Sequence, residues 1–123
     1  MTTVLLVDDD RSVRQALERM LLTAGYVVIE AASGSEAMAA VERLGPVIDV
    51  LVSDIVMPRM HGDELALAVR QRVPDVEVLL ISGYPDALER SRQTETGDWA
   101  YLGKPFRMET FLEVVNDLVS RSR

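Results

Sequence analysis

Short apolar runs alternate with segments of helical periodicity along the whole chain. The apolar runs predict buried strands, and apolar residues that recur every third or fourth position predict amphipathic helices. The predicted strands span residues 4–7, 26–29, 50–54, 76–81 and 99–102. The helical stripes span residues 13–24, 37–44, 65–73, 85–95 and 108–119. Strands that alternate with helices in this way indicate βαβ units, and therefore a parallel sheet.

The pattern predicts an α/β fold, a three-layer sandwich in which five helices cover the two faces of a five-stranded parallel sheet. The last helix has the clearest apolar face. Segment 85–95 offers only Ala87 and Leu88 as apolar residues, so we expect that helix to be held loosely. No repeat or linker-like stretch interrupts the pattern, and a chain of 123 residues predicts one domain over residues 1–123.

Composition and charge exclude several classes of function. The formal net charge of −7 argues against direct nucleic-acid binding, because that binding needs basic side chains to neutralise phosphates. The chain has no cysteine, which excludes disulfides, thiolate metal sites and cysteine nucleophiles. The sequence shows neither a signal peptide nor an apolar run long enough to span a bilayer, so we expect a cytoplasmic protein without membrane contact.

A few polar residues stand at the ends of the predicted strands. They are Asp8 and Asp9 after the first strand, Asp54 at the end of the third, Ser82 after the fourth, and Lys104, the chain's single lysine, after the fifth. The carboxyl ends of parallel strands meet at one edge, which is where such sheets bind ligands. We therefore expect these side chains to converge.

These residue types together suit phosphoryl transfer. Carboxylates gathered at one edge repel each other, and magnesium suits such a cluster because it prefers oxygen ligands and leaves positions for water and phosphate. Phosphoryl transfer further needs an in-line nucleophile and fixed positive charge. Asp54 can attack, since carboxylates form aspartyl phosphates. Lys104 can pair with one phosphoryl oxygen, and the Ser82 hydroxyl can donate to another.

At these positions the sequence resembles the response-regulator receiver family of two-component signalling. The matching motifs are Val7-Asp8-Asp9, residues 54–62 with Met57-Pro58 and Gly62, Ser82-Gly83, and Lys104-Pro105-Phe106. The four motifs stand in the right order, and the resemblance extends over essentially the whole chain. The resemblance implies a flavodoxin-like fold with strand order 2-1-3-4-5. It also implies a phosphoacceptor signalling domain that promotes its own phosphorylation and dephosphorylation, and not an enzyme.

The resemblance assigns a role to each site residue. The implied roles are phosphoacceptor for Asp54, phosphate counter-charge for Lys104, switch residues for Ser82 and Tyr101, and metal site for Asp8, Asp9, Asp54 and the backbone carbonyl of Val56. Asp8 would act through a metal-bound water, and the ion would be Mg²⁺, with Mn²⁺ as a substitute. The donor would be a phosphohistidine on a sensor histidine kinase or histidine phosphotransfer protein. The output face would be the fourth helix, fifth strand and last helix.

Three other functions share parts of this pattern. Asp8 and Asp10 form an Asp-x-Asp, as in haloacid-dehalogenase-like phosphatases, with Asp8 as nucleophile and Asp10 as acid/base; that motif leaves Asp54 unexplained. A flavodoxin-like electron carrier needs a phosphate-cradling loop after the first strand, where three aspartates would repel the FMN phosphate. A receiver-like module that is never phosphorylated is the third, and the presence of every site residue argues against it.

Each motif also has a simpler structural interpretation. The three consecutive aspartates can be helix-capping acids, which the helix dipole favours. Ser82-Gly83 is also an ordinary turn signal, and Tyr101 can be a half-buried ring without a further role. The single histidine, His61, is assigned no function.

Overall fold

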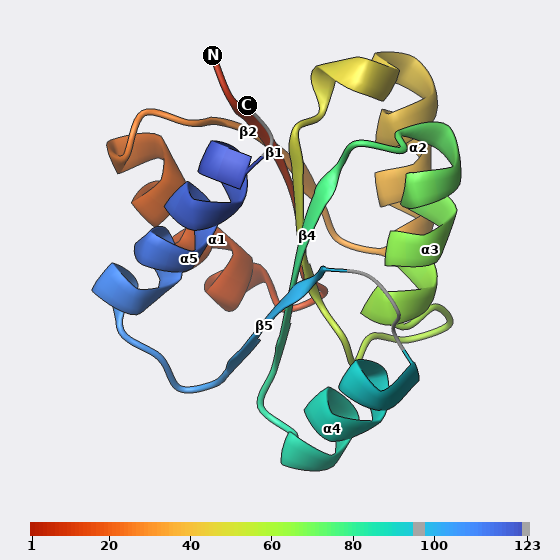
Figure 1. Ribbon diagram of the computed structural model, residues 1–123, viewed down its shortest axis with the longest axis vertical. Helices are drawn as coiled ribbons and strands as arrows, with labels where there is room; N and C mark the ends of the chain where they lie inside the picture. The colour runs from red at the N-terminus through yellow and green to blue at the C-terminus, as the bar shows by residue number, and fades with distance from the viewer. Residues whose placement is uncertain (95–97, 122–123) are drawn as a thin grey trace.

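The computed structural model describes residues 1–94 and 98–121, which form a five-stranded parallel sheet between two layers of helices (Figure 1). The strands are β1 (Thr3–Val7), β2 (Val27–Ala31), β3 (Val50–Asp54), β4 (Glu77–Ser82) and β5 (Ala100–Gly103). The helices are α1 (Arg11–Thr23), α2 (Gly34–Leu44), α3 (Gly62–Arg72), α4 (Pro85–Thr94) and α5 (Met108–Arg121), with a 3-10 turn at Gly45–Val47. The strand order is β2-β1-β3-β4-β5, which confirms the predicted class and order.

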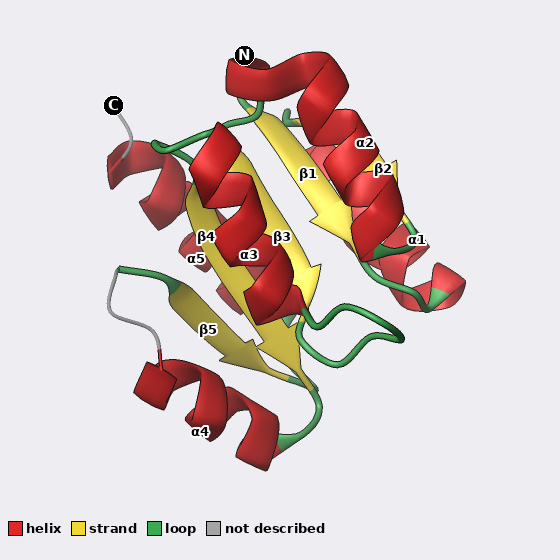
Figure 2. Cartoon of the chain, turned by 90° about the vertical axis from the view of Figure 1, so that its right-hand side faces the viewer, coloured by secondary structure: helices red, strands yellow, loops and turns green. Residues whose placement is uncertain are grey.

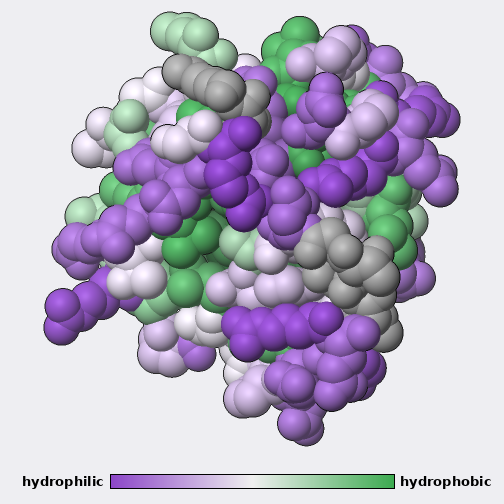
Figure 3. Space-filling view, viewed as in Figure 1, coloured by the Kyte–Doolittle hydropathy of each residue, from purple (hydrophilic) through white to green (hydrophobic). Residues whose placement is uncertain are grey.

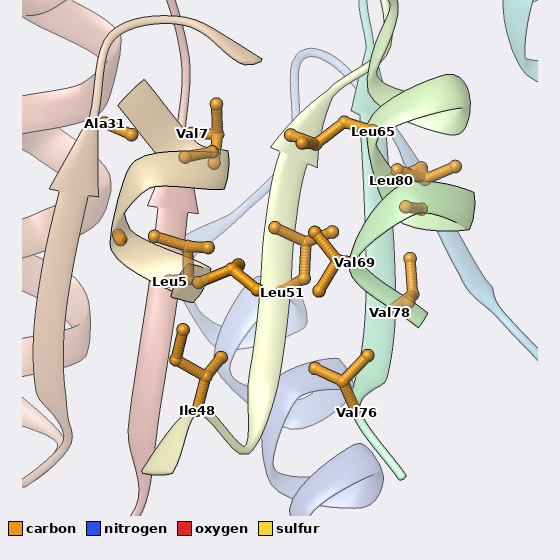
Figure 4. Packing of buried hydrophobic residues seen from close by; sticks show 14 of the residues in the cluster. Leu5, Val7, Ala31, Ile48, Leu51, Leu65, Val69, Val76, Val78 and Leu80 are labelled. Atoms are coloured by element: carbon orange, nitrogen blue, oxygen red, sulfur yellow. The ribbon is translucent and has the colours of Figure 1, made fainter. Parts of the chain in front are cut away.

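The central strands β1, β3 and β4 are buried on both faces, and this explains their uninterrupted apolar sequences. Alternate side chains point to opposite faces of the sheet. On one face Leu5, Leu51 and Leu80 pack beneath α2 and α3 (Figure 4). On the other face the neighbouring residues of the same strands pack against α1 and α5, around the fully buried Phe111. Two hydrophobic layers therefore hold the strands in register.

All the strands point the same way, so the loops that follow them gather at one end of the molecule (Figure 2). The chain runs from β1 outward to β2, and then returns to place β3 on the other side of β1. The order of the strands thus reverses between β1 and β3, which is where ligands bind in sheets of this kind. This crevice lies directly above the ends of β1 and β3.

The structure shifts the predicted bounds of four strands. β1 starts one residue earlier, and β2, β4 and β5 start one residue later and end later as well, at Ala31, Ser82 and Gly103. The ladder with β4 begins at Ala100 opposite Leu79, so β5 starts one residue later than predicted and Trp99 precedes it. Trp99 is apolar enough to extend a strand pattern, but the β4–β5 ladder begins at the next residue, Ala100. The predicted helix over 85–95 is observed as α4, and its residue 95 lies outside the described part of the chain.

Helix α4 has the thin buried stripe that its sequence predicts. Ala87 and Ser91 are buried and Leu88 is half-buried, while most of the remaining described side chains of the helix are exposed. Ser91 was not predicted as a buried position, because a serine gives no hydrophobic signal. None of the helices in the described ranges has the length and hydrophobicity that crossing a membrane would require.

Candidate functional site

An open pocket of about 780 Å³ lies at the carboxyl edge of the sheet. It is lined by Asp8, Asp9, Asp10, Asp54, Val56, Met57, Pro58, Gly83, Tyr84 and Lys104. Asp8, Asp9, Asp54, Val56 and Lys104 of the predicted site therefore line it, and Ser82 and Tyr101 are not among its lining residues. These five predicted residues converge because each one ends its strand or follows it by no more than two residues.

Three carboxylates come together in this pocket. Asp8, Asp9 and Asp54 each place one carboxylate oxygen within 4.8 Å of the others. The pairing of Val7 with Ser53 in the β1–β3 ladder sets the two following aspartates side by side. Asp8 is buried, Asp9 is exposed, and the Asp54 side chain is 12% exposed, so the Asp54 carboxylate is reachable from solvent.

Lys104 brings the positive charge that the cluster lacks. Its Nζ lies 3.6 Å from Asp8 Oδ2 and 3.6 Å from Asp54 Oδ1. The backbone N–H of Lys104 donates to the carbonyl oxygen of Ser82 at 2.9 Å, so the end of β5 is tied to the end of β4. The peptide bond between Lys104 and Pro105 is cis. The ammonium group thus bridges the ends of β1 and β3 from the far edge of the sheet.

Burial and crowding of charge disfavour full ionisation of this cluster. Burial raises the pKa of Asp54 to about 6; Lys104 lowers it, and the charges of Asp8 and Asp9 raise it. Burial also raises the pKa of Asp8, although the backbone N–H of Asp10 and the charge of Lys104 lower it. A cation bound beside these carboxylates would favour their ionised form and lower their pKa values. Three oxygen donors within reach of one ion fit magnesium.

Asp10 serves a different purpose from its two neighbours. Its Oδ1 accepts hydrogen bonds from the backbone N–H groups of Ser12 at 2.9 Å and Val13 at 3.2 Å. Asp10 is therefore the N-cap of α1. The capping interpretation of the acidic run is thus correct for Asp10. A carboxylate committed to a helix cap is not free for acid/base chemistry, which removes the basis of the phosphatase alternative.

The two predicted switch residues link the pocket to α4. The Ser82 hydroxyl is buried and accepts the backbone N–H of Tyr84 at 3.0 Å. The Tyr101 hydroxyl donates to the carbonyl oxygen of Ser91 at 3.3 Å. The guanidinium carbon of Arg92 lies 5.3 Å from the centre of the Tyr101 ring. Tyr101 is thus held against α4 by both a hydrogen bond and a cation–π contact.

The loop after Asp54 folds back onto the end of β3. The backbone N–H of Gly62 donates to the carbonyl oxygen of Ile55 at 2.8 Å, which closes the loop. A Cβ atom at Gly62 would collide with the carbonyl oxygen of Asp54. Within the loop, Arg59 adopts a left-handed conformation with φ of 72°. Glycine is thus required at Gly62 because two backbones meet there.

Comparison with known proteins identifies the family of this chain. Residues 4–116 match the family described as "Response regulator receiver domain". The chain belongs to the response regulator receiver family. This receiver is 39% identical over 120 residues to the sensor kinase CckA of Brucella abortus, covering 97% of the chain and 13% of the kinase. It is 38% identical over 120 residues to the response regulator MprA of Mycobacterium leprae, covering 98% of the chain and 52% of MprA. It therefore spans about half of MprA.

Solved structures agree with the receiver assignment. Chemotaxis protein CheY4 of Vibrio cholerae superimposes with a TM-score of 0.83 at 34% identity, covering 96% of this chain and 98% of CheY4. Response regulator TrrA of Thermotoga maritima, solved in complex with Mg(2+)-BeF, gives a TM-score of 0.83 at 28% identity, covering 96% of this chain and 99% of TrrA.

One residue beside the site was not predicted. Arg14 of α1 donates from Nη1 to the carbonyl oxygen of Asp8 at 2.7 Å. It also pairs with Glu30 on β2, with 3.1 Å between Nε and Oε1. Neither partner is at helical spacing from Arg14, so periodicity gives no signal for these contacts.

Gly62→Ala should destabilise the receiver by about 2 kcal/mol, because the added methyl group forces apart two backbone segments beside Asp54. Urea denaturation measures this difference. Gly83→Ala is the matched control, since its Cβ would meet the Lys104 Cβ at an ordinary 3.8 Å. Equal stability of Gly62→Ala and wild type would contradict the close approach.

Asp54→Asn should stabilise the metal-free receiver at pH 7 by about 1 kcal/mol, because it removes a charge that the folded state disfavours. The raised pKa sets the sign of the pH dependence. The unfolded carboxyl ionises near pH 3.8 and the folded one near 6, so the penalty on wild type develops between these values and is complete above them.

The stability difference between Asp54→Asn and wild type should therefore shrink as the pH falls from 7 to about 4. Urea denaturation in EDTA at several pH values measures this. Asp75→Asn changes an exposed carboxylate and should have little effect. A pH-independent difference for Asp54→Asn would refute the electrostatic cause.

Proposed function

We propose that this receiver accepts a phosphoryl group on Asp54 from a phosphohistidine donor in a magnesium-dependent reaction. The observation that carries the proposal is the position of Lys104 Nζ, 3.6 Å from Asp54 Oδ1 in an open pocket that Asp8 and Asp9 also line. A partly exposed carboxylate beside a fixed cation and two further carboxylates has the parts that phosphoryl transfer needs. We further infer that residues 1–123 form one receiver domain, a signalling domain and not an enzyme.

The metal ligands in this proposal are Asp9, Asp54 and the backbone carbonyl of Val56, with Asp8 acting through a bound water. The clustering of the three carboxylates supports this set, and Val56 lines the same pocket. Bound magnesium supplies positive charge that offsets the charge on the phosphoryl oxygens. The solved structure of TrrA in complex with Mg(2+)-BeF supports magnesium as the ion for this receiver, and manganese offers the same oxygen-binding chemistry.

In the transfer step, a carboxylate oxygen of Asp54 attacks the phosphorus in line with the bond to the donor imidazole nitrogen. The new P–O bond forms as the P–N bond breaks, and the electron pair of that bond stays on the imidazole nitrogen. The Lys104 ammonium pairs with one equatorial phosphoryl oxygen. In this structure the Ser82 hydroxyl accepts a hydrogen bond from the Tyr84 N–H. When the hydroxyl turns toward the phosphoryl group, it can donate its proton to a second phosphoryl oxygen.

The signal passes, in our proposal, from Ser82 to Tyr101 and α4. Turning the Ser82 hydroxyl toward a phosphoryl group breaks its hydrogen bond with the Tyr84 N–H, which directly precedes α4. Loss of that anchor moves a helix with few buried side chains. Tyr101 follows because its hydroxyl and ring are held by Ser91 and Arg92 of that helix.

The output face is then formed by α4, β5 and α5. On the side drawn in Figure 3, the surface over α4 is mainly hydrophilic, and hydrophobic atoms lie beside α5. A sensor histidine kinase or a histidine phosphotransfer protein is the proposed donor, which the likeness to CckA supports. A cytoplasmic location remains a prediction from composition, as does the absence of direct nucleic-acid and membrane binding.

Asp54→Asn should abolish phosphorylation by acetyl phosphate in the presence of magnesium, and Asp9→Ala should do so by losing the metal. Phosphate-affinity electrophoresis or intact-mass measurement reports the modification. Asp10→Asn is the matched control, because asparagine caps a helix as well as aspartate does. Retained activity of Asp10→Asn supports the receiver assignment; full labelling of Asp54→Asn would exclude Asp54 as the acceptor.

Beryllofluoride with magnesium should change hydrogen exchange in α4 by about threefold or more, since a thinly anchored helix opens at low free-energy cost. Mass spectrometry of peptides covering residues 85–94 measures the effect, and α2 serves as the internal reference. Asp54→Asn should show no change on the same treatment. Identical hydrogen exchange in α4 of the wild type with and without beryllofluoride would contradict the proposed switch. It would not contradict the proposed phosphorylation of Asp54.

A further inference from the structure

Arg14 holds the backbone of the acidic turn from outside the pocket. Its Nη1 donates to the carbonyl oxygen of Asp8 at 2.7 Å, and its Nε pairs with Glu30 Oε1 at 3.1 Å. The side chain is only 15% exposed, and Arg14 is not among the residues that line the pocket. The guanidinium thus connects the start of α1, the end of β1 and the end of β2 beneath the carboxylate cluster.

The polar groups of Asp8 are nearly all committed to this turn. Its backbone N–H donates to the carbonyl oxygen of Ala31 at 3.2 Å, and its Oδ1 accepts the N–H of Asp10 at 2.9 Å. Its carbonyl oxygen accepts from Arg14, and its Oδ2 faces Lys104 at 3.6 Å. Asp8 is therefore held from β2 on one side and from α1 on the other, with one carboxylate oxygen directed at the cluster.

The bond from Arg14 also orients Asp9. The carbonyl group that Arg14 binds belongs to the peptide unit that joins Asp8 to Asp9. A peptide unit is planar, so fixing its carbonyl oxygen fixes the direction in which the chain enters Asp9. Without the guanidinium, this peptide unit can rotate, and the carboxylates of Asp8 and Asp9 then no longer keep a fixed position relative to each other. The exposed Asp9, for which few other anchors are described, is the residue most affected.

We propose that Arg14 is a positioning residue for the metal site, which it organises by holding the peptide unit between Asp8 and Asp9. This inference rests on the proposed function, because it takes Asp8, Asp9 and Asp54 as the residues that hold magnesium. An arginine suits the position because its planar fork offers donors in two directions, to a carbonyl and to a carboxylate at once. A lysine has one charged nitrogen and meets this geometry only in part.

Geometry and charge make opposite predictions for this residue. Arg14 is a cation close to the site, so by charge alone its removal would strengthen magnesium binding. If it acts by positioning, its removal weakens magnesium binding, because groups that orient metal ligands typically contribute tenfold or more to affinity. The direction of the change therefore decides between the two roles.

The experiment titrates MgCl₂ against the stability of the whole chain, measured by urea denaturation. The magnesium-dependent gain in stability reports the dissociation constant and is separate from the stability of the metal-free variant. Arg14→Met should raise the magnesium dissociation constant about tenfold. Arg14→Lys, which conserves the charge and keeps the test valid if Arg14→Met folds poorly, should raise it by a smaller factor.

Arg72→Met is the matched control, since Arg72 makes an exposed ion pair with Glu42 at 3.4 Å, away from the pocket. It should leave the magnesium dissociation constant unchanged. Unchanged or tighter magnesium binding in both Arg14 variants would overturn the positioning role while the proposed function stands. Absence of any magnesium-dependent stabilisation in the wild type would overturn both the positioning role and the proposed function. The same holds if magnesium stabilises Asp9→Ala and Asp54→Asn as much as it stabilises the wild type.

Discussion

The rest of the site depends on holding three carboxylates together at one sheet edge against their own repulsion. Asp8, Asp9 and Asp54 place oxygens within 4.8 Å of one another, and Lys104 offsets part of this charge. The raised pKa values of Asp8 and Asp54 show that the cluster remains unfavourable when ionised. Because the ionised carboxylates are unfavourable together, a bound cation stabilises the site. The same arrangement thus costs stability without metal and favours the binding of a cation.

The protein maintains this cluster through the backbone. Strands β1 and β3 are fixed by hydrophobic layers on both faces, so their ends cannot move apart. Around them, the Asp10 cap starts α1, and the close approach at Gly62 turns the chain directly after the acceptor. Arg14 joins the Asp8 carbonyl oxygen to the Glu30 carboxylate on β2, and the backbone N–H of Lys104 donates to the Ser82 carbonyl oxygen at the end of β4. The Asp8 and Ser82 carbonyl groups are thus held at the backbone, while Lys104 Nζ faces the carboxylates of Asp8 and Asp54.

Much of the fold was predictable because buried parallel strands carry uninterrupted apolar sequences that end abruptly. That is why the end of β3 at Asp54, and the positions of Asp8 and Lys104 directly after their strands, could be read from the sequence. The prediction was one residue early at the edge strand, where Trp99 extends the apolar run but lies outside the ladder. Ser91 was missed as a buried residue, since its burial depends on the packing of α4 and not on its hydrophobicity.

The sequence by itself determined the order of the elements, the ends of β1 and β3 and the identity of the clustered groups, because these follow from local periodicity and from the rule that parallel strands share one carboxyl edge. Only the tertiary structure separated Asp10, the helix cap, from Asp8 and Asp9 in the cluster. It also revealed the contacts of Arg14 with Asp8 and Glu30, and those that hold Tyr101 against α4. Such contacts join side chains to groups on other elements, and their geometry is set by how the layers pack.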